Sequence, residues 1–164
     1  MGFFKDFISD LVENIGVYFA GDNISAVKAF STETIGFPLN KQIISIGFSS
    51  VKNNIADTRY SGENKTGYFF TRALSIELDI NIFVPYEIGS DGCFEILNGI
   101  MDYFTFEQNR YKVSFINAGK AEHFAKLDAM KLRCTVGIDL NADLQMDNSI
   151  EFGGFDIRRR ENVV

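Results

Sequence analysis

The sequence is poor in the residue types on which many enzymes and small secreted proteins depend. Its 164 residues include one histidine, two cysteines, two prolines and no tryptophan. The cysteines, Cys93 and Cys134, form no CxxC pair, so the sequence predicts neither a zinc site nor a redox motif. We expect both to be small buried hydrophobic residues. His123 has no nucleophilic partner in a recognisable pattern, so it predicts no hydrolase triad.

Sequence motifs for catalysis and cofactor binding are also missing. There is no GxSxG or HExxH motif, and the glycines lack the spacing of a Walker A loop or a dinucleotide fingerprint. Glu77 and Asp79 could act as an acid and a base, but on an exposed strand face they are more simply interpreted as solvated charges. We therefore expect no catalytic activity, no cofactor and no metal site.

Basic residues are scarce relative to acidic ones. Lysine and arginine number 16 against 22 aspartates and glutamates, and the formal net charge is −6. This balance disfavours nucleic-acid binding through a broad basic face, because such affinity depends on neutralised phosphates. No segment approaches the ~20 apolar residues of a membrane span. We expect neither sequence-specific nucleic-acid binding nor membrane association.

Two stretches carry apolar residues at helical spacing. The first covers residues 3–20 and predicts an amphipathic helix. The second covers residues 91–104, with Ser90 or Asp91 placed to act as the N-cap. Apolar residues make up 46% of the chain, which is enough for a core without disulfides or metal. We expect both helices to pack on the apolar face of a sheet.

Strict alternation of apolar and polar residues predicts the main strands. It is clearest over residues 73–84 and recurs over 130–140, as expected for an antiparallel sheet with one solvated face. Residues 42–51 and 111–117 predict further strands, and the region after residue 24 predicts at most a short one. Residues 118–129 are interpreted as an irregular connection. Residues 52–66, rich in Asn, Asp, Ser, Gly and Lys, predict a long exposed hairpin loop.

These elements predict an α+β fold. It consists of an antiparallel or mixed β-sheet with two α-helices packed on one face, a long β-hairpin and a C-terminal arm. We expect a single domain over residues 1–149 and an arm over 150–164. If the strands at 73–84 and 130–140 pair antiparallel, Lys131 and Arg133 lie across from Glu77 and Asp79 and neutralise these carboxylates.

This arrangement resembles the tail terminator, or tail completion, proteins of long-tailed phages and of phage-tail-like contractile particles. The resemblance is architectural and covers about residues 3–141. It consists of the N-terminal helix, the strand QIISIGFSSV with its hairpin, the strand ALSIELDINIFVP, the helix CFEILNGIMDYF and the late strand KLRCTVGIDL.

The resemblance implies a structural protein without catalytic activity. Such proteins form a ring, usually of six copies, that caps the end of the tail tube, stops its polymerisation and joins it to the head or collar. The implied partners are further copies of the chain, the tail tube protein, and sheath and collar or head-joining proteins. The implied location is the virion or tail-like particle, after assembly in the cytoplasm of the bacterial host.

A closed ring uses two different patches on each subunit, and we place them in the hairpin and the arm. The candidate contact residues are Lys52, Asn53, Asp57, Arg59, Tyr60, Glu63, Lys65, Arg158, Arg159 and Arg160. If the polar strand face lines a central channel, its candidate lining residues are Glu77, Asp79, Lys131 and Arg133. The carboxylates there would repel a passing DNA backbone.

Two other interpretations remain open. The chain could be a tail tube subunit, a tube initiator or a head–tail joining protein, since those share the helix-plus-sheet plan. It could also be a small-molecule binding domain or an enzyme with a pocket between helix 91–104 and the sheet. That last interpretation requires convergent polar groups in an apolar cavity, whereas the predicted inner face is almost entirely aliphatic.

Overall fold

The computed structural model describes residues 2–29, 39–64 and 67–147. The chain divides into two compact units, one formed by Met1–Lys52 and Leu74–Leu140 and the other by Asn53–Ala73 and Asn141–Val164. The elements in chain order are α1 (Phe3–Tyr18), the short η1 (Ala20–Asp22), β1 (Ile24–Lys28), β2 (Gln42–Asn64), β3 (Gly67–Pro85), α2 (Ser90–Asp102), the π-helical turn η2 (Tyr103–Glu107), β4 (Lys112–Phe124) and β5 (Ala129–Asp147).

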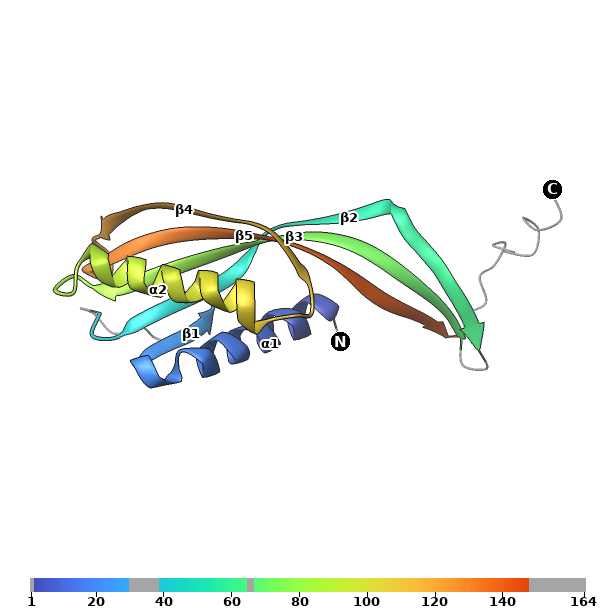
Figure 1. The fold of residues 1–164 in the computed structure, drawn as a ribbon, viewed down its shortest axis with the longest axis horizontal. Coiled ribbons are helices and arrows are strands. Elements are labelled where there is room, and N and C mark those ends of the chain that lie inside the picture. The colour runs from blue at the N-terminus through green and yellow to red at the C-terminus, as the bar shows by residue number, and fades with distance from the viewer. Residues whose placement is uncertain (1, 30–38, 65–66, 148–164) are drawn as a thin grey trace. The chain divides into compact units, whose positions relative to one another are not determined.

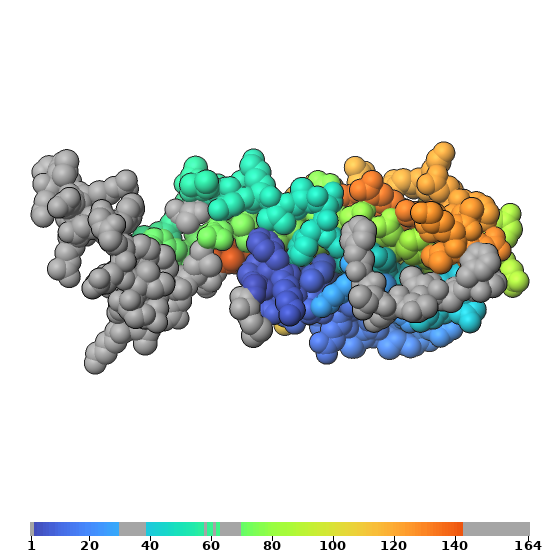
Figure 2. Space-filling view, turned by 180° about the vertical axis from the view of Figure 1, so that it is seen from behind, coloured from blue at the N-terminus to red at the C-terminus, as the bar shows by residue number. Residues whose placement is uncertain are grey.

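The five described strands form one mixed sheet in the order β1-β2-β3-β5-β4. β1 runs parallel to β2, with Ile24 opposite Gln42, and β4 runs antiparallel to β5. The α+β prediction is therefore confirmed, and so is the short strand after residue 24. Within the first unit, both helices lie on the same side of the sheet (Figure 1). Seen from behind, α1 with β1 and β4 with the start of β5 occupy opposite margins of that unit (Figure 2).

The helix-covered face of the first unit is an aliphatic core. The apolar half of the β3 alternation is buried, as predicted, with relative exposures of 3% or less from Leu74 to Val84. The matching set on β5 is formed by Leu132, Cys134, Val136 and Ile138, which are 1% exposed or less. No polar or charged side chain is buried anywhere in the described ranges. Apolar burial therefore stabilises this layer without internal polar networks.

The first predicted helix is confirmed as α1. Leu11 and Ile15 form its buried stripe, and Phe4 and Phe7 extend the contact by packing their rings against Phe48 of β2. After η1, Asn23 adopts the left-handed conformation with φ 55°, which asparagine tolerates better than most residues. The chain thereby turns directly from the helix into β1.

The second predicted helix is confirmed as α2, but its predicted N-cap is wrong. Gly89 occupies the cap position with φ 79°, no side chain caps the helix, and Ser90 and Asp91 already lie within the first turn. A positive φ at this bend favours glycine over the predicted polar caps. The two helices meet where the Phe19 ring lies against Gly99 of α2, and a Cβ added there would be 2.6 Å from the ring.

Four strands, β2, β3, β4 and β5, are longer than predicted. Residues 52–64 belong to β2 rather than to a loop, and β3 already begins at Gly67. β4 continues to Phe124, so most of the predicted irregular connection at 118–129 is also strand. These segments lack apolar alternation, the signal used to predict strands. The backbone hydrogen bonds that form a ladder do not depend on it.

The second unit is described over 53–64, 67–73 and 141–147, which are parts of β2, β3 and β5. Tyr60 and Phe70 make an edge-to-face contact across the β2–β3 hairpin, with ring centroids 5.5 Å apart. The hairpin is therefore a paired ribbon, not an open loop. The predicted arm at 150–164, with the domain boundary before it, lies outside the described residues.

Candidate subunit-contact surfaces

The hairpin residues predicted to make subunit contacts are exposed wherever their side chains are described. This holds for Asn53, Asp57, Arg59 and Tyr60 in the second unit, and for Lys52, the last β2 residue of the first unit. Their positions on a strand rather than a loop fix which side chains share a face, because alternate residues point the same way. The structure places Glu63 in β2, while Lys65, Arg158, Arg159 and Arg160 lie outside the described residues.

The most exposed apolar side chain among the described residues of this ribbon was not among the predicted contacts. Ile55 has a relative exposure of 77%, and Tyr60, five residues along the strand, has 53%. The odd spacing places the two on opposite faces of β2, so both faces of this segment carry accessible apolar surface. The sequence signal that could have identified Ile55 is a single aliphatic residue within a long polar stretch.

The four predicted channel-lining residues lie on the sheet face opposite the helices. Glu77 and Asp79 are two residues apart on β3, and Lys131 and Arg133 are two apart on β5, the neighbouring strand. Arg133 donates a hydrogen bond from Nε to Oδ1 of Asp79 at 2.7 Å. Ser75 donates from Oγ to Oδ1 of Asp139 at 2.8 Å. From the Ser75–Asp139 contact to the Asp79–Arg133 contact, the residue number increases on β3 and decreases on β5. The two strands therefore run in opposite directions, as predicted.

The expected partner of Lys131 is wrong. No ion pair joins it to Glu77; its amine instead lies 5.8 Å from the ring centroid of Phe83 and 5.1 Å from that of Phe124. The two rings contact each other with centroids 5.6 Å apart, and their negative π faces attract the ammonium group. We did not foresee this cluster because Phe83 and Phe124 are far apart in the sequence.

The polar face is consequently less acidic than the β3 sequence suggests. Asp79 accepts the hydrogen bond of Arg133 and thereby raises the pKa of that guanidinium, with Glu77 adding a smaller effect in the same direction. Arg133 stays charged and neutralises Asp79. Any ligand or polymer passing over this face would meet alternating charges rather than a purely acidic row.

The two cysteines are buried, and the histidine contacts a neighbouring carboxylate. Burial raises the pKa of Cys93 to about 11 and that of Cys134 to about 11, so both thiols are protonated at neutral pH and poor nucleophiles. Nε2 of His123 lies 3.0 Å from Oδ1 of Asp128, within hydrogen-bonding distance, beside the turn between β4 and β5. Over the described ranges, no group of three or more His, Cys, Asp or Glu residues is arranged to hold a metal ion.

No family model matches this chain, and a search of curated proteins found no relative. Of the helices in the described part of the chain, none combines the length and the apolar character required to cross a membrane.

A second surface that the sequence analysis missed lies on α2. Phe94 is 47% exposed, Met101 is 43% exposed, and Phe106 in η2 is 77% exposed. Phe94 and Met101 are seven residues apart, which is close to two helical turns, so they lie on the same flank of the helix. The apolar stripe of α2 is therefore wider than the part that packs on the sheet. Counting apolar positions around the helix could have revealed this excess.

Proposed function

We propose that the protein is a structural subunit of a phage tail or of a phage-tail-like contractile particle. Its copies form a ring that caps the end of the tail tube, stops tube polymerisation and joins the tube to the head or collar. The architecture of two helices on one face of a mixed sheet with a long hairpin supports this proposal. The observation that carries most weight is the exposure of β2 in the second unit.

The described side chains of β2 in this ribbon are mostly exposed. A narrow β-ribbon without packing on its faces is only marginally stable in water, and Ile55 leaves 77% of its surface exposed. Burying such a side chain contributes roughly 1.5–3 kcal/mol. A neighbouring copy that covers Ile55 would therefore stabilise both the ribbon and the assembly.

A rotationally closed ring requires two different patches on each subunit. The ribbon is one of them. The helix-covered first unit has a close-packed aliphatic interior and provides a rigid body against which a neighbouring ribbon can bind. Neither surface needs a catalytic group, a cofactor or a nucleic-acid site.

The proposal is tested by measuring the mass of the native full-length chain, alone and mixed with the tail tube protein of the same particle. We expect a closed oligomer, with a hexamer as the proposed state, and tubes of regulated length in the mixture. Electron microscopy with a labelled chain separates this role from that of a tube subunit, because a terminator occupies one end of the tube. A strict monomer that leaves tube length unregulated contradicts the proposal.

A pair of matched variants tests the ribbon directly. Ile55→Asp should abolish or strongly weaken ring formation while leaving the circular dichroism spectrum unchanged, and it should unfold like the native chain at concentrations at which both are monomeric. Val17→Asp is the control, because Val17 is an aliphatic residue of α1 with a similar exposure of 71%, and it should assemble like the native chain. If the two variants form rings equally well, the ribbon is not part of the interface between subunits.

A further inference from the structure

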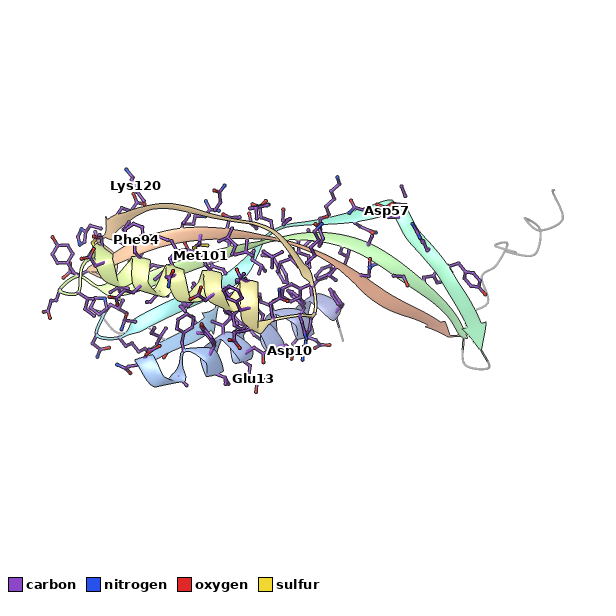
Figure 3. The ribbon with its side chains drawn as sticks, in the orientation of Figure 1. Asp10, Glu13, Asp57, Phe94, Met101 and Lys120 are labelled. Atoms are coloured by element: carbon purple, nitrogen blue, oxygen red, sulfur yellow. The ribbon has the colours of Figure 1, made fainter. Side chains whose placement is uncertain are left out.

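The exposed apolar side chains of α2 and η2 define a docking surface. We call Phe94, Met101 and Phe106 the α2 strip. Figure 3 labels Phe94 and Met101 on α2, in the same helix layer as Asp10 and Glu13 of α1. The strip is only partly covered by the rest of the described chain, since each member keeps between 43% and 77% of its surface exposed. Exposed aromatic and Met side chains gathered on one surface are typical of an interaction site.

The charged side chains of α2 and η2 themselves all have one sign. Residues 90–107 contain four acidic side chains, Asp91, Glu95, Asp102 and Glu107, and no lysine or arginine. None of the four forms an ion pair with another residue of the described ranges, where Arg133 pairs with Asp79 and His123 contacts Asp128. The strip therefore fits an occupant that combines apolar side chains with positive charge.

One segment of this chain has that combination. Residues 152–160 carry Phe152, Phe155 and Ile157, followed at once by the only run of three consecutive basic residues in the sequence, 158–160. This segment lies outside the described residues. Its aromatic residues match the apolar strip, and its arginines match the acidic residues around it.

We propose that the α2 strip of one copy binds residues 152–160 of a neighbouring copy. Phe152, Phe155 and Ile157 cover the strip, and the three arginines contact the acidic residues of α2 and η2. This inference rests on the proposed ring, and it names the surface that receives the arm.

The course of β5 relates the two ends of the strip to the point where the chain leaves the first unit. Sγ of Cys93 lies 3.7 Å from the carbonyl oxygen of Met130, so α2 begins beside the start of β5. From Met130, β5 runs ten residues to Leu140, where it leaves the first unit. At the rise of an extended strand this is about 33 Å. The chain therefore leaves the unit far from Phe94 and closer to the Phe106 end of the strip, because Lys112 of β4 pairs with Asp139 of β5.

Cross-linking between two differently tagged full-length chains tests the contact. One chain carries Met101→Cys and the other Phe155→Cys, and a short bis-maleimide is added to the mixture. The native thiols are 0% exposed and should not react. We expect a covalent heterodimer in this mixture. The matched control pairs Phe155→Cys with Lys120→Cys, an exposed position on β4 rather than on α2 (Figure 3), and should give at most background cross-linking.

Charge-reversal variants test the electrostatic attraction between the arm and the α2 strip. They also distinguish an arm that binds a neighbouring copy from an arm that binds its own chain. Arg158→Glu/Arg159→Glu/Arg160→Glu and Asp91→Lys/Glu95→Lys should each weaken self-association roughly 3- to 10-fold at low salt. Mixing the two variants should restore association, because each chain then meets a complementary charge on its neighbour. An arm bound to its own chain would give no recovery on mixing.

Three results would overturn the inference: cross-linking to Met101 no stronger than to Lys120, association unaffected by both charge variants, or no recovery on mixing. The tube assay gives an independent result for the proposed function. If the chain forms a ring and caps tubes but gives no Met101–Phe155 cross-link, the proposed function stands and the contact between the α2 strip and the arm is refuted. If the chain forms the cross-link but does not cap tubes, the contact stands and the proposed function is refuted.

Discussion

β3 in the first unit and β2 in the second are both regular strands, but they use their side chains in opposite ways. From Leu74 to Val84, every second residue of β3 is 3% exposed or less, whereas in β2 Ile55 is 77% exposed and Tyr60 53%. The first strand is fixed by burying one face. The second is held by its strand ladder and by contacts such as that of Tyr60 with Phe70, which leaves its side chains accessible to another molecule.

The largest expected effect comes from placing the same charge in both strands. Ile80→Asp puts a carboxylate at a position of 0% exposure, where an unpaired charge costs several kcal/mol. We expect this variant to be unfolded or to lose most of its stability in urea denaturation. Ile55→Asp, at 77% exposure, should change the free energy of unfolding by less than about 0.5 kcal/mol. Comparable losses in both variants would refute the distinction between the two strands.

Ionisation of the two buried thiols should destabilise the same aliphatic layer at high pH. Burial raises the pKa of Cys93 and Cys134 to about 11 from 9.0, so the unfolded chain releases these protons first. Stability is therefore unaffected well below pH 9 and falls as the pH rises from 9 to 11, by up to about 2–3 kcal/mol for each thiol. Urea denaturation at a series of pH values measures this loss.

The double variant Cys93→Ala/Cys134→Ala isolates the thiols from other groups. Burial also raises the pKa of Tyr103 and Tyr111, and the variant retains both tyrosines. It should lose less stability between pH 9 and 11 than the native chain, after the difference at pH 7 is subtracted. An identical alkaline decline in the two proteins would show that the thiols do not contribute.

The contact between the helices gives a smaller effect. In Gly99→Ala the new Cβ would lie 2.6 Å from Phe19, and Phe19 is only 4% exposed, so its ring has little room to move. We expect a net loss of about 1–2 kcal/mol in thermal or urea unfolding, because overpacking exceeds the gain in helix propensity. Gly21→Ala is the control, since no atom lies within 4 Å of its added Cβ. Equal stability of the two variants would show that the helices separate easily.

The sequence predicted those features that depend on periodic burial. Both helices and the alternation of β3 and β5 follow from the spacing of apolar residues. The contact of Asp79 with Arg133 agrees with the hypothesis that opposite charges on these two strands face each other. The ends of β2 and β4 could not be predicted in this way, because a strand held mainly by backbone hydrogen bonds leaves no apolar period. The Gly89 cap depends on a backbone angle that the sequence does not specify.

The candidate contact surfaces were predicted only in part. The polar hairpin residues are exposed as expected, but Ile55 and the α2 strip were missed because apolar residues were assigned to the core by default. Lys131 was paired with Glu77 because charge was considered and aromatic neighbours were not. Phe83 and Phe124 come together only through the order of the strands, which brings β4 beside β5 and β5 beside β3.

The smallest expected effect concerns the polar face and distinguishes the two basic residues of β5. A double-mutant cycle of Asp79→Asn with Arg133→Gln should show a favourable coupling that disappears at high salt, because both groups are partly exposed and joined at 2.7 Å. A cycle of Glu77→Gln with Lys131→Met should be additive, since the Lys131 amine lies over two aromatic rings. Urea denaturation of each variant at low and high salt gives both couplings. A coupling between Glu77 and Lys131 as large as that between Asp79 and Arg133 would mean that Lys131 leaves the rings in solution. The polar face would then have a second neutralised carboxylate.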